Sequence, residues 1–302
     1  MEKPKNSECP ICASEYVLPR FVVLDHEEGE SFELQRCSSC ALIWVNNPPP
    51  AEKLGQYYTS LMGQSMRRKP SSFFAKLRRV RLKADVRPFS KTLQHGSTVI
   101  DFGTGDGSLA MELAKASYKV EARDMYPMSD WDNPDIRYAA INVGNPTKAD
   151  FLIEGKPAEA VIMRHVLEHS PDPVLLLKTI RDAGVKHVIA IVPNANSFLA
   201  KRFKTRWYYW DPPRHLFHFQ TQTLEVLASV TGGSIGSLQK YGIDEILSSF
   251  NRTIRVNCLR QEKTPSGFLL NLTHPTGVFA GLMSGVTGVI SKGVIRVRID
   301  FE

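Results

Sequence analysis

Between residues 99 and 241 the chain alternates short, almost continuous apolar runs with stretches in which apolar residues recur every three or four positions. The first pattern is typical of strands covered on both faces, and the second of amphipathic helices. The alternation therefore predicts an α/β protein built on a mostly parallel sheet. The expected strands are 99–102, 119–123, 136–140, 160–164, 186–192 and 232–241, with helices at 109–114, 173–183 and 221–230 and a closing strand at 293–301.

The first of these strands contains Asp101 and leads into a turn with glycine at every second position, at Gly103, Gly105 and Gly107. Glycine allows a positive φ and lets a ligand approach the backbone, and the following helix start offers free N–H groups. A pyrophosphate fingerprint would place its third glycine or alanine at Ser108, and the carboxylate of Asp101 would repel a pyrophosphate. A dinucleotide site and a purely structural turn remain the alternatives to a site for a ligand that carries an ammonium group.

Four of the five cysteines form two C-x-x-C pairs, Cys9 with Cys12 and Cys37 with Cys40. Two such pairs can bring four thiolates onto one tetrahedral metal ion, so this spacing predicts a structural zinc ribbon. A site closed by four thiolates has no open coordination position, and we assign it no catalytic role. Redox chemistry and unligated thiols are the alternatives.

The turn Asp-x-Gly-x-Gly-x-Gly resembles motif I of the class I S-adenosylmethionine (SAM)-dependent methyltransferases. The resemblance implies a doubly wound, seven-stranded Rossmann-like sheet in which the closing strand lies antiparallel between the fifth and the sixth. It also implies that SAM is bound by the residues of the turn, namely Asp101, Gly103, Thr104, Gly105 and Gly107.

The second strand ends in Asp124, about 20 residues after the glycine turn, where this topology places an acceptor for ribose hydroxyls. Glu121 on the same strand is expected to face solvent, because strand side chains alternate between the two faces. The family often has an aspartate after the third strand that contacts the adenine amine. Asn142 is the nearest candidate here, and it departs from the family pattern.

The string HVLEH at residues 165–169, taken alone, matches the H-x-x-E-H pattern of inverted zinc proteases. That chemistry needs a helix, and here a strand precedes the string while Ser170-Pro171-Asp172-Pro173 ends it, so we reject a protease. The string resembles the segment after strand four of SAM methyltransferases. The resemblance implies His165 near the cofactor, with Glu168 and His169 at the edge of the acceptor pocket. Alternatively, Glu168 and His169 only bond neighbouring loops.

Residues 194–220 form a long aromatic and cationic segment that we expect to act as a substrate lid. Its string DPPRHLFHF, residues 211–219, resembles a segment of the zinc-ribbon and ubiquinone-type methyltransferases. Histidine is suited to removing the acceptor's proton near neutral pH, and we expect His215 to be this base, with His169 second. Alternatively, His215 only caps the loop. Arg214 would hold a substrate phosphate or pair with Asp211.

The order of cysteine pairs, the proline break at residues 48–50 and a helix with Tyr57 and Tyr58 resembles the N-terminal module of the zinc-ribbon methyltransferases. That group includes C-methyltransferases acting on nucleotide-linked deoxysugars. The expected domains are a zinc ribbon at 1–50, a helical linker or cover at 51–95, and a methyltransferase domain at 96–302. The last would carry the lid at 194–220 and a helical insertion at 243–292.

The 302 residues carry a net charge of +7, with cations dense between residues 66 and 94. These cations form a solvated helix face or guide an anionic substrate. No apolar leader follows Met1, and the apolar tract 278–290 is too short to span a bilayer, so we expect a cytoplasmic protein without membrane contact.

We therefore expect a methyltransferase that acts on a small molecule, with a nucleotide-linked or phosphorylated sugar as the candidate acceptor. A nucleic-acid or protein methyltransferase and a non-catalytic SAM-binding protein are the alternatives.

Overall fold

The computed structural model describes residues 8–25, 29–50, 53–58, 72–125, 136–241 and 292–302. The chain divides into two compact units, each assembled from segments that are distant in sequence. The first, called here the cysteine unit, contains Met1–Leu61, Val192–Val226 and Gln239–Arg296. The second, called the sheet unit, contains Met62–Ile191, Leu227–Leu238 and Val297–Glu302.

This division differs from the boundaries that we expected near residues 50 and 95. The expected lid, residues 194–220, groups with the N-terminal module, because its tryptophans and the strands of that module share one apolar core. The expected helical insertion at 243–292 lies outside the described residues except for Lys292.

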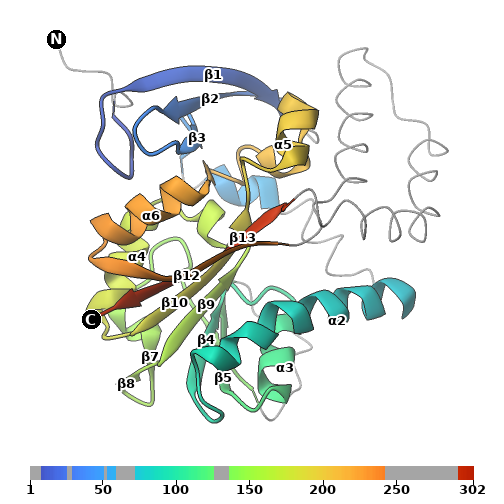
Figure 1. Ribbon diagram of the computed structural model, residues 1–302, viewed down its shortest axis with the longest axis vertical. Coiled ribbons are helices and arrows are strands. Elements are labelled where there is room, and N and C mark those ends of the chain that lie inside the picture. The colour runs from blue at the N-terminus through green and yellow to red at the C-terminus, as the bar shows by residue number, and fades with distance from the viewer. Residues whose placement is uncertain (1–7, 26–28, 51–52, 59–71, 126–135, 242–291) are drawn as a thin grey trace. The chain divides into compact units, whose positions relative to one another are not determined.

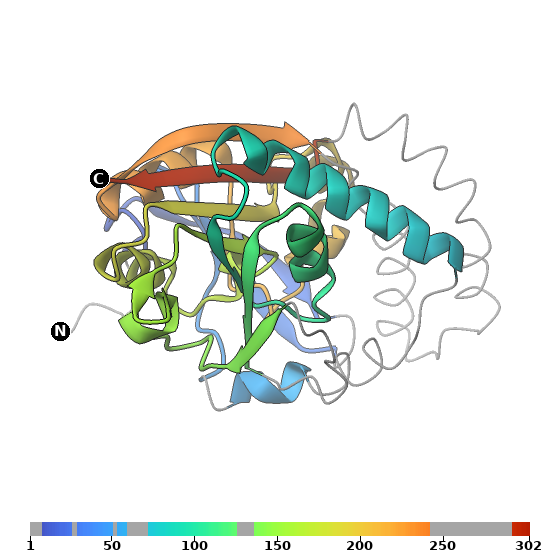
Figure 2. The ribbon, with the colours of Figure 1, turned by 90° about the horizontal axis from the view of Figure 1, so that it is seen from below.

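The predicted seven-stranded sheet has the strand order β12-β13-β10-β9-β4-β5-β6 (Figure 1). Most of it belongs to the sheet unit, and one end of each of β10, β12 and β13 belongs to the cysteine unit. Strand β4 pairs in parallel with β5 on one side and with β9 on the other, and β9 pairs in parallel with β10. Strand β13 lies between β10 and β12, and its arrow points opposite to that of β12 (Figure 2). The predicted position of the closing strand is therefore confirmed. The bounds are β4 Thr98–Phe102, β5 Lys119–Asp124, β6 Arg137–Ala140, β9 Ala160–Arg164, β10 His187–Pro193, β12 Gly233–Tyr241 and β13 Val294–Phe301.

Helices flank this sheet, and their apolar faces form a core with the strands. Leu82 of α2 and Leu109 and Leu113 of α3 are buried in the same cluster as Val120 and Ile162 of the strands. The predicted start of α4 is confirmed, because the side chain of its N-cap residue Asp172 accepts a hydrogen bond from the N–H of Leu175 at 2.8 Å. Among the described helices, none is both long enough and apolar enough to cross a membrane. The bounds are α2 Ser72–Val86, η1 Arg87–Lys91, α3 Ser108–Lys115, η2 Lys148–Phe151, β7 Leu152–Ile153, β8 Lys156–Pro157, η3 Leu167–His169, α4 Pro173–Asp182 and α6 Thr221–Val230.

Glu121 does not face solvent as the strand alternation suggested. Its carboxylate lies 2.6 Å from the guanidinium of Arg123, and its side chain is 14% exposed. Arg123 also donates to the carbonyls of Asp150 and Leu152, so residues 150–152 cover this face of β5. Alternation fixes which residues share a face, and only tertiary packing decides whether that face is covered.

The cysteine unit contains a four-stranded sheet with the order β1-β2-β3-β11. β1 (Val17–Leu24), β2 (Ser31–Cys37) and β3 (Ile43–Val45) form an antiparallel meander, drawn in blue in Figure 1. β11 (Phe217–His218) pairs antiparallel with β3, so that Phe217 is opposite Trp44. The remaining elements are a short helix at residues 53–58, α5 (Phe198–Phe203), η4 (Lys204–Arg206) and η5 (Tyr208–Trp210). The core of this unit therefore combines buried residues from 23–45 with buried residues from 195–210.

Candidate cofactor site and cysteine cluster

The turn between β4 and α3 has the backbone that its three glycines predict. Gly103, Gly105 and Gly107 all have a positive φ, of 74°, 55° and 70°. A Cβ added at Gly103 would lie 2.5 Å from a methyl carbon of Val166, so packing alone requires glycine there. A Cβ added at Gly105 would meet no atom of the described residues within 4 Å. The turn therefore presents the backbone of Gly105 to open space at the carboxyl end of β4, the edge where parallel sheets bind ligands.

The buried side chain of Asp101 stabilises this turn through a hydrogen bond. Its side chain is 1% exposed, and one carboxylate oxygen accepts a hydrogen bond from the hydroxyl of Thr104 at 2.7 Å. Burial raises the pKa of Asp101 to about 7, and the bond from Thr104 opposes that rise. Asp101 and Thr104, both predicted to bind the cofactor, therefore hold the shape of the turn.

Asp124 at the end of β5 bonds directly to the glycine turn. One carboxylate oxygen accepts from the N–H of Gly105 at 2.7 Å, and the other accepts from the N–H of Met125, also at 2.7 Å. The N–H groups of Gly103 and Thr104 donate to the carbonyl of Arg123, at 2.7 and 3.2 Å. These hydrogen bonds join the ends of the two neighbouring strands and place Asp124 beside the turn. Its predicted contact with ribose hydroxyls stays a prediction.

Asn142 lies beyond the end of β6 and is exposed. Its side-chain oxygen accepts a hydrogen bond from the N–H of Gly144 at 3.2 Å, which is a local Asx-type turn. That contact orders the loop after β6. It does not test the predicted adenine contact.

The HVLEH string follows β9 and contains a single 3-10 turn, Leu167–His169. His165 has a φ of 56°, and its Nδ1 lies 3.2 Å from a carboxylate oxygen of Glu168, which is 1% exposed. The two histidines are therefore not displayed on one helix face, and the rejection of a zinc-protease helix is confirmed. The bond between Glu168 and His165 is the local contact that we considered as the alternative to a substrate role for Glu168.

His215 belongs to the cysteine unit, whereas Glu168 and His169 belong to the sheet unit. The His215 ring is 7% exposed and stacks on Tyr209 with the ring planes 13° apart. Its Nδ1 lies 2.8 Å from the carbonyl oxygen of Tyr209. A carbonyl only accepts, so Nδ1 carries the hydrogen and Nε2 is the basic nitrogen of the neutral ring.

Arg214 is enclosed by two carboxylates. It is 3% exposed, and its guanidinium lies 2.7 Å from Asp25 and donates two bonds to Asp211, at 2.7 and 3.0 Å. Burial alone would lower the pKa of Arg214, but bonds and charges from Asp211 and Asp25 outweigh burial and raise it. The predicted pairing with Asp211 is confirmed. Asp25 was missed, because nothing in its local pattern marks a partner that lies 189 residues away.

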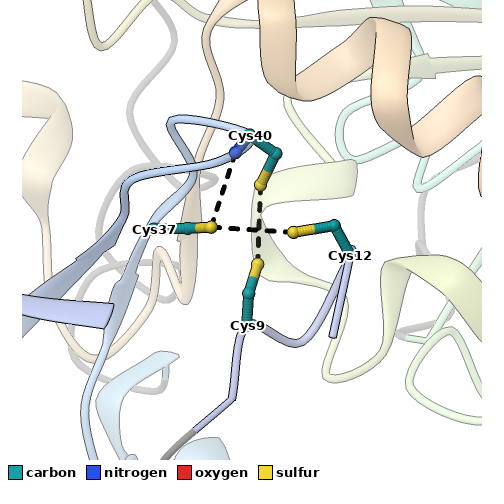
Figure 3. A group of neighbouring side chains, drawn as sticks. All are labelled: Cys9, Cys12, Cys37 and Cys40. Atoms are coloured by element: carbon teal, nitrogen blue, oxygen red, sulfur yellow. Dashed lines mark hydrogen bonds between the residues drawn. The ribbon is translucent and has the colours of Figure 1, made fainter. Parts of the chain in front are cut away.

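The four cysteines of the two C-x-x-C pairs point at a common centre (Figure 3). All four sulfurs lie within 4.8 Å of one another, with Cys9 3.5 Å from Cys40 and Cys12 3.6 Å from Cys37. Disulfide sulfurs lie about 2.05 Å apart, whereas sulfurs at the corners of a tetrahedron with Zn–S bonds of about 2.3 Å are roughly 3.8 Å apart. The observed spacing fits a tetrahedral metal ion and excludes a disulfide between these pairs.

The sulfurs of the cysteine cluster bond one another and nearby backbone N–H groups. The hydrogen bond with Cys40 lowers the pKa of Cys9 to about 5, whereas the same bond raises the pKa of Cys40 and burial raises that of Cys12. The backbone N–H groups of Ser39 and Cys40 donate to the sulfur of Cys37, at 3.3 and 3.4 Å. Donors aimed at a sulfur stabilise its negative charge, which a metal ligand requires. The donor set therefore fits Zn²⁺.

Comparison with known proteins identifies the family of the chain. A family model described as a methyltransferase domain matches residues 74–232. No curated protein sequence matches the chain. The solved structure of 1,6-didemethyltoxoflavin-N1-methyltransferase from Burkholderia thailandensis, with bound S-adenosylhomocysteine, is similar over 94% of this chain and 99% of that one, at 12% identity and a TM-score of 0.50.

Two further solved structures are similar over less of the chain. A SAM-dependent methyltransferase from Archaeoglobus fulgidus is 14% identical, with 76% of this chain and all of that one covered (100%) and a TM-score of 0.47. Magnesium protoporphyrin IX methyltransferase from Synechocystis PCC 6803 is also 14% identical, covering 62% and 92%, with a TM-score of 0.46. At 12% identity the Burkholderia structure indicates a shared fold. The family model covers more than half of the chain, and the chain therefore belongs to the methyltransferase domain family.

Proposed function

We propose that this methyltransferase uses SAM to methylate a small molecule. The observation that carries the proposal is the bond between Asp124 and the N–H of Gly105, which joins an acidic strand end to a glycine turn that faces open space. A carboxylate can accept hydrogen bonds from the ribose hydroxyls of such a cofactor, and an exposed glycine backbone lets the rest of the cofactor approach closely. The Burkholderia enzyme of similar fold, which holds S-adenosylhomocysteine, supports the choice of cofactor.

Each residue of the proposed site has its own task. Asp124 would accept bonds from the ribose hydroxyls, and the three turn glycines would let the cofactor approach the backbone. Asp101 would hold the turn through Thr104. Asn142 would meet the adenine and His165 the methionine part.

Proton removal from the acceptor is the second task of the protein. When bound, SAM supplies an electrophilic methyl group on a sulfonium. Nε2 of His215 is proposed to take the acceptor's proton, because Tyr209 fixes the tautomer that leaves this nitrogen basic. His169 is the second candidate for this base, and Glu168 is proposed to act at the acceptor pocket. Positioning would provide much of the remaining rate enhancement.

The acceptor is proposed to be a nucleotide-linked or phosphorylated sugar. The net charge of +7 suits an anionic substrate, and the sequence resemblance to sugar C-methyltransferases points to the same class. Arg214 is not assigned to the substrate phosphate, because two carboxylates already neutralise it. The four cysteines are proposed to hold a structural Zn²⁺.

The cofactor assignment is tested by calorimetric titration of the full chain with SAM. Asp124→Asn should weaken binding by roughly ten- to a hundredfold, because bonds to a charged acceptor contribute about 1.5–3 kcal/mol. Glu121→Gln, on the same strand but bonded to Arg123, is the matched control and should bind as the wild type does. Equal affinities in the two variants would remove Asp124 from the site.

The acceptor class is tested by a labelled-methyl screen of nucleotide-linked sugars, phenols and RNA. Transfer to the first class supports the proposed acceptor. Labelling of RNA, with affinity that falls steeply with salt, would establish a nucleic-acid methyltransferase instead. SAM binding without transfer to any acceptor would favour a non-catalytic SAM-binding protein.

A further inference from the structure

The segment that carries His215 contributes β11 to the four-stranded sheet, in which β2 ends at Cys37. We name residues 207–223 the His215 segment. Within it β11 pairs with β3, and the N–H of Val45 donates to the carbonyl of Leu216 at 3.0 Å. The strand next to the second C-x-x-C pair therefore holds the backbone immediately after His215.

Three side chains bond the backbone at and beside this cysteine pair. Thr223 donates through its hydroxyl to the carbonyl of Cys40 at 2.9 Å. Gln222 and Gln220 donate through their amides to the carbonyls of Ser39, at 2.7 Å, and Ala41, at 3.0 Å. The conformation of residues 39–41 thus determines where one end of the His215 segment is held.

The other end of the segment is anchored to β1. Arg214 bonds Asp25, which directly follows β1, and Trp210 packs edge-on against Phe21 with ring centroids 5.0 Å apart. The backbone N–H of His215 donates to the carbonyl of Asp211 at 2.9 Å. His215 therefore lies between two attachments, one to β1 and one to the second cysteine pair.

From these contacts we propose that metal binding by the four cysteines positions the His215 segment, so that loss of the metal displaces His215 while the SAM site stays intact. The proposal deepens the proposed function, since it makes the zinc ribbon a regulator of the base. The ligand is a divalent cation that prefers thiolates. Thr223 is a positioning residue in this scheme, because it acts through the carbonyl of Cys40.

The test needs no methyl acceptor and uses the full chain. Two of the four tryptophans, Trp207 and Trp210, are buried in the His215 segment, and Trp44 is on β3. The fourth tryptophan, Trp131, belongs to the sheet unit. In a Trp131→Phe background, tryptophan fluorescence therefore comes only from the cysteine unit. Removing the metal with a chelator should shift this emission to the red. It should also speed hydrogen exchange of residues 207–223 at least tenfold, while β4 and β9 exchange as before.

A second set of variants keeps all four cysteines. Thr223→Val should retain one metal per chain and speed exchange of the His215 segment about fivefold, the factor that corresponds to a lost hydrogen bond of about 1 kcal/mol. Thr223→Ser should restore the wild-type rate. Thr221→Val is the matched control, because the buried hydroxyl of Thr221 has no hydrogen-bond partner among the described residues.

The proposal is overturned if metal removal leaves tryptophan emission and exchange of residues 207–223 unchanged. It is also overturned if Thr221→Val accelerates exchange as much as Thr223→Val does. SAM titration of the same samples separates this proposal from the proposed function. A segment that responds to metal in a chain that never binds SAM would confirm the metal dependence and refute the cofactor assignment.

Discussion

Replacing Gly105 by valine tests the glycine turn without creating a clash inside the protein. Gly105 has a φ of 55°, and an added Cβ meets no atom within 4 Å in the part of the chain that the structure describes. A left-handed conformation costs an L-residue about 1–2 kcal/mol, and a β-branched side chain is at the upper end of that range. The variant should therefore fold, with its melting temperature lowered by roughly 2–8 °C.

Gly155→Val provides the matched control for that backbone cost. Gly155 has a φ of 77° and lies in the turn between β7 and β8. A Cβ there also meets no atom of the described residues within 4 Å. Thermal unfolding should show similar losses of stability in the two variants. Calorimetry should show wild-type SAM affinity for Gly155→Val and a loss of at least about a hundredfold for Gly105→Val, equivalent to about 2.7 kcal/mol.

The reasoning is refuted if Gly105→Val binds SAM as tightly as Gly155→Val does. The metal content should remain the same in both variants, because the glycine turn belongs to the sheet unit and the cysteines to the other. Loss of metal together with SAM affinity would mean that the substitution disrupts more than the cofactor site.

Three further predictions concern buried polar groups. Because the pKa of Asp101 is raised to about 7, its carboxyl group is protonated in the folded chain and ionised in the unfolded chain between about pH 4 and 7. The contribution of this group to the free energy of unfolding is therefore full below about pH 4. It falls as the pH rises to about 7, by up to about 4 kcal/mol. Urea unfolding should show that Asp101→Asn lacks this decline, and an equal pH dependence in the variant would contradict the assignment. Asp25→Ala should lower the free energy of unfolding, measured by denaturant titration, by about 3 kcal/mol, because it leaves the buried Arg214 without one of its carboxylates. In an Arg214→Met background the same substitution should cost much less. Equal losses in the two backgrounds would show that Asp25 and Arg214 are not coupled. Once an acceptor is known, His215→Gln should lower turnover by roughly 10²–10⁴ without changing the SAM dissociation constant, and undiminished turnover would exclude His215 as the base.

The elements of the sheet unit could be predicted from the sequence because their signals are local. Apolar runs placed the strands to within a residue or two, and the glycine spacing located a turn whose three positive φ values the structure confirms. The convergence of Asp124 on this turn also followed from topology, since adjacent parallel strands end at the same edge of a sheet.

The cysteine unit could be predicted only in part, because its contacts join residues that are distant in sequence. The C-x-x-C spacing indicated the cluster, but a strand of two residues such as β11 gives no periodic signal. The ion pair of Asp25 with Arg214 and the bond of Thr223 to Cys40 span 189 and 183 residues. The burial of Glu121 could not be predicted for the same reason, because its face of β5 is covered by residues 150–152, which are distant in sequence.

The pairing of β11 with β3 has a consequence for how the chain is made. Because synthesis proceeds from the N-terminus, β3 emerges from the ribosome well before β11, which lies more than 170 residues later in the sequence. Until β11 is synthesised, the edge of β3 that pairs with it has no partner strand. Closing such a long loop carries an entropic cost and slows folding. During that interval the apolar edge at Ile43, Trp44 and Val45 is a template for pairing between nascent chains, and a fragment that stops after residue 50 would keep that edge exposed permanently.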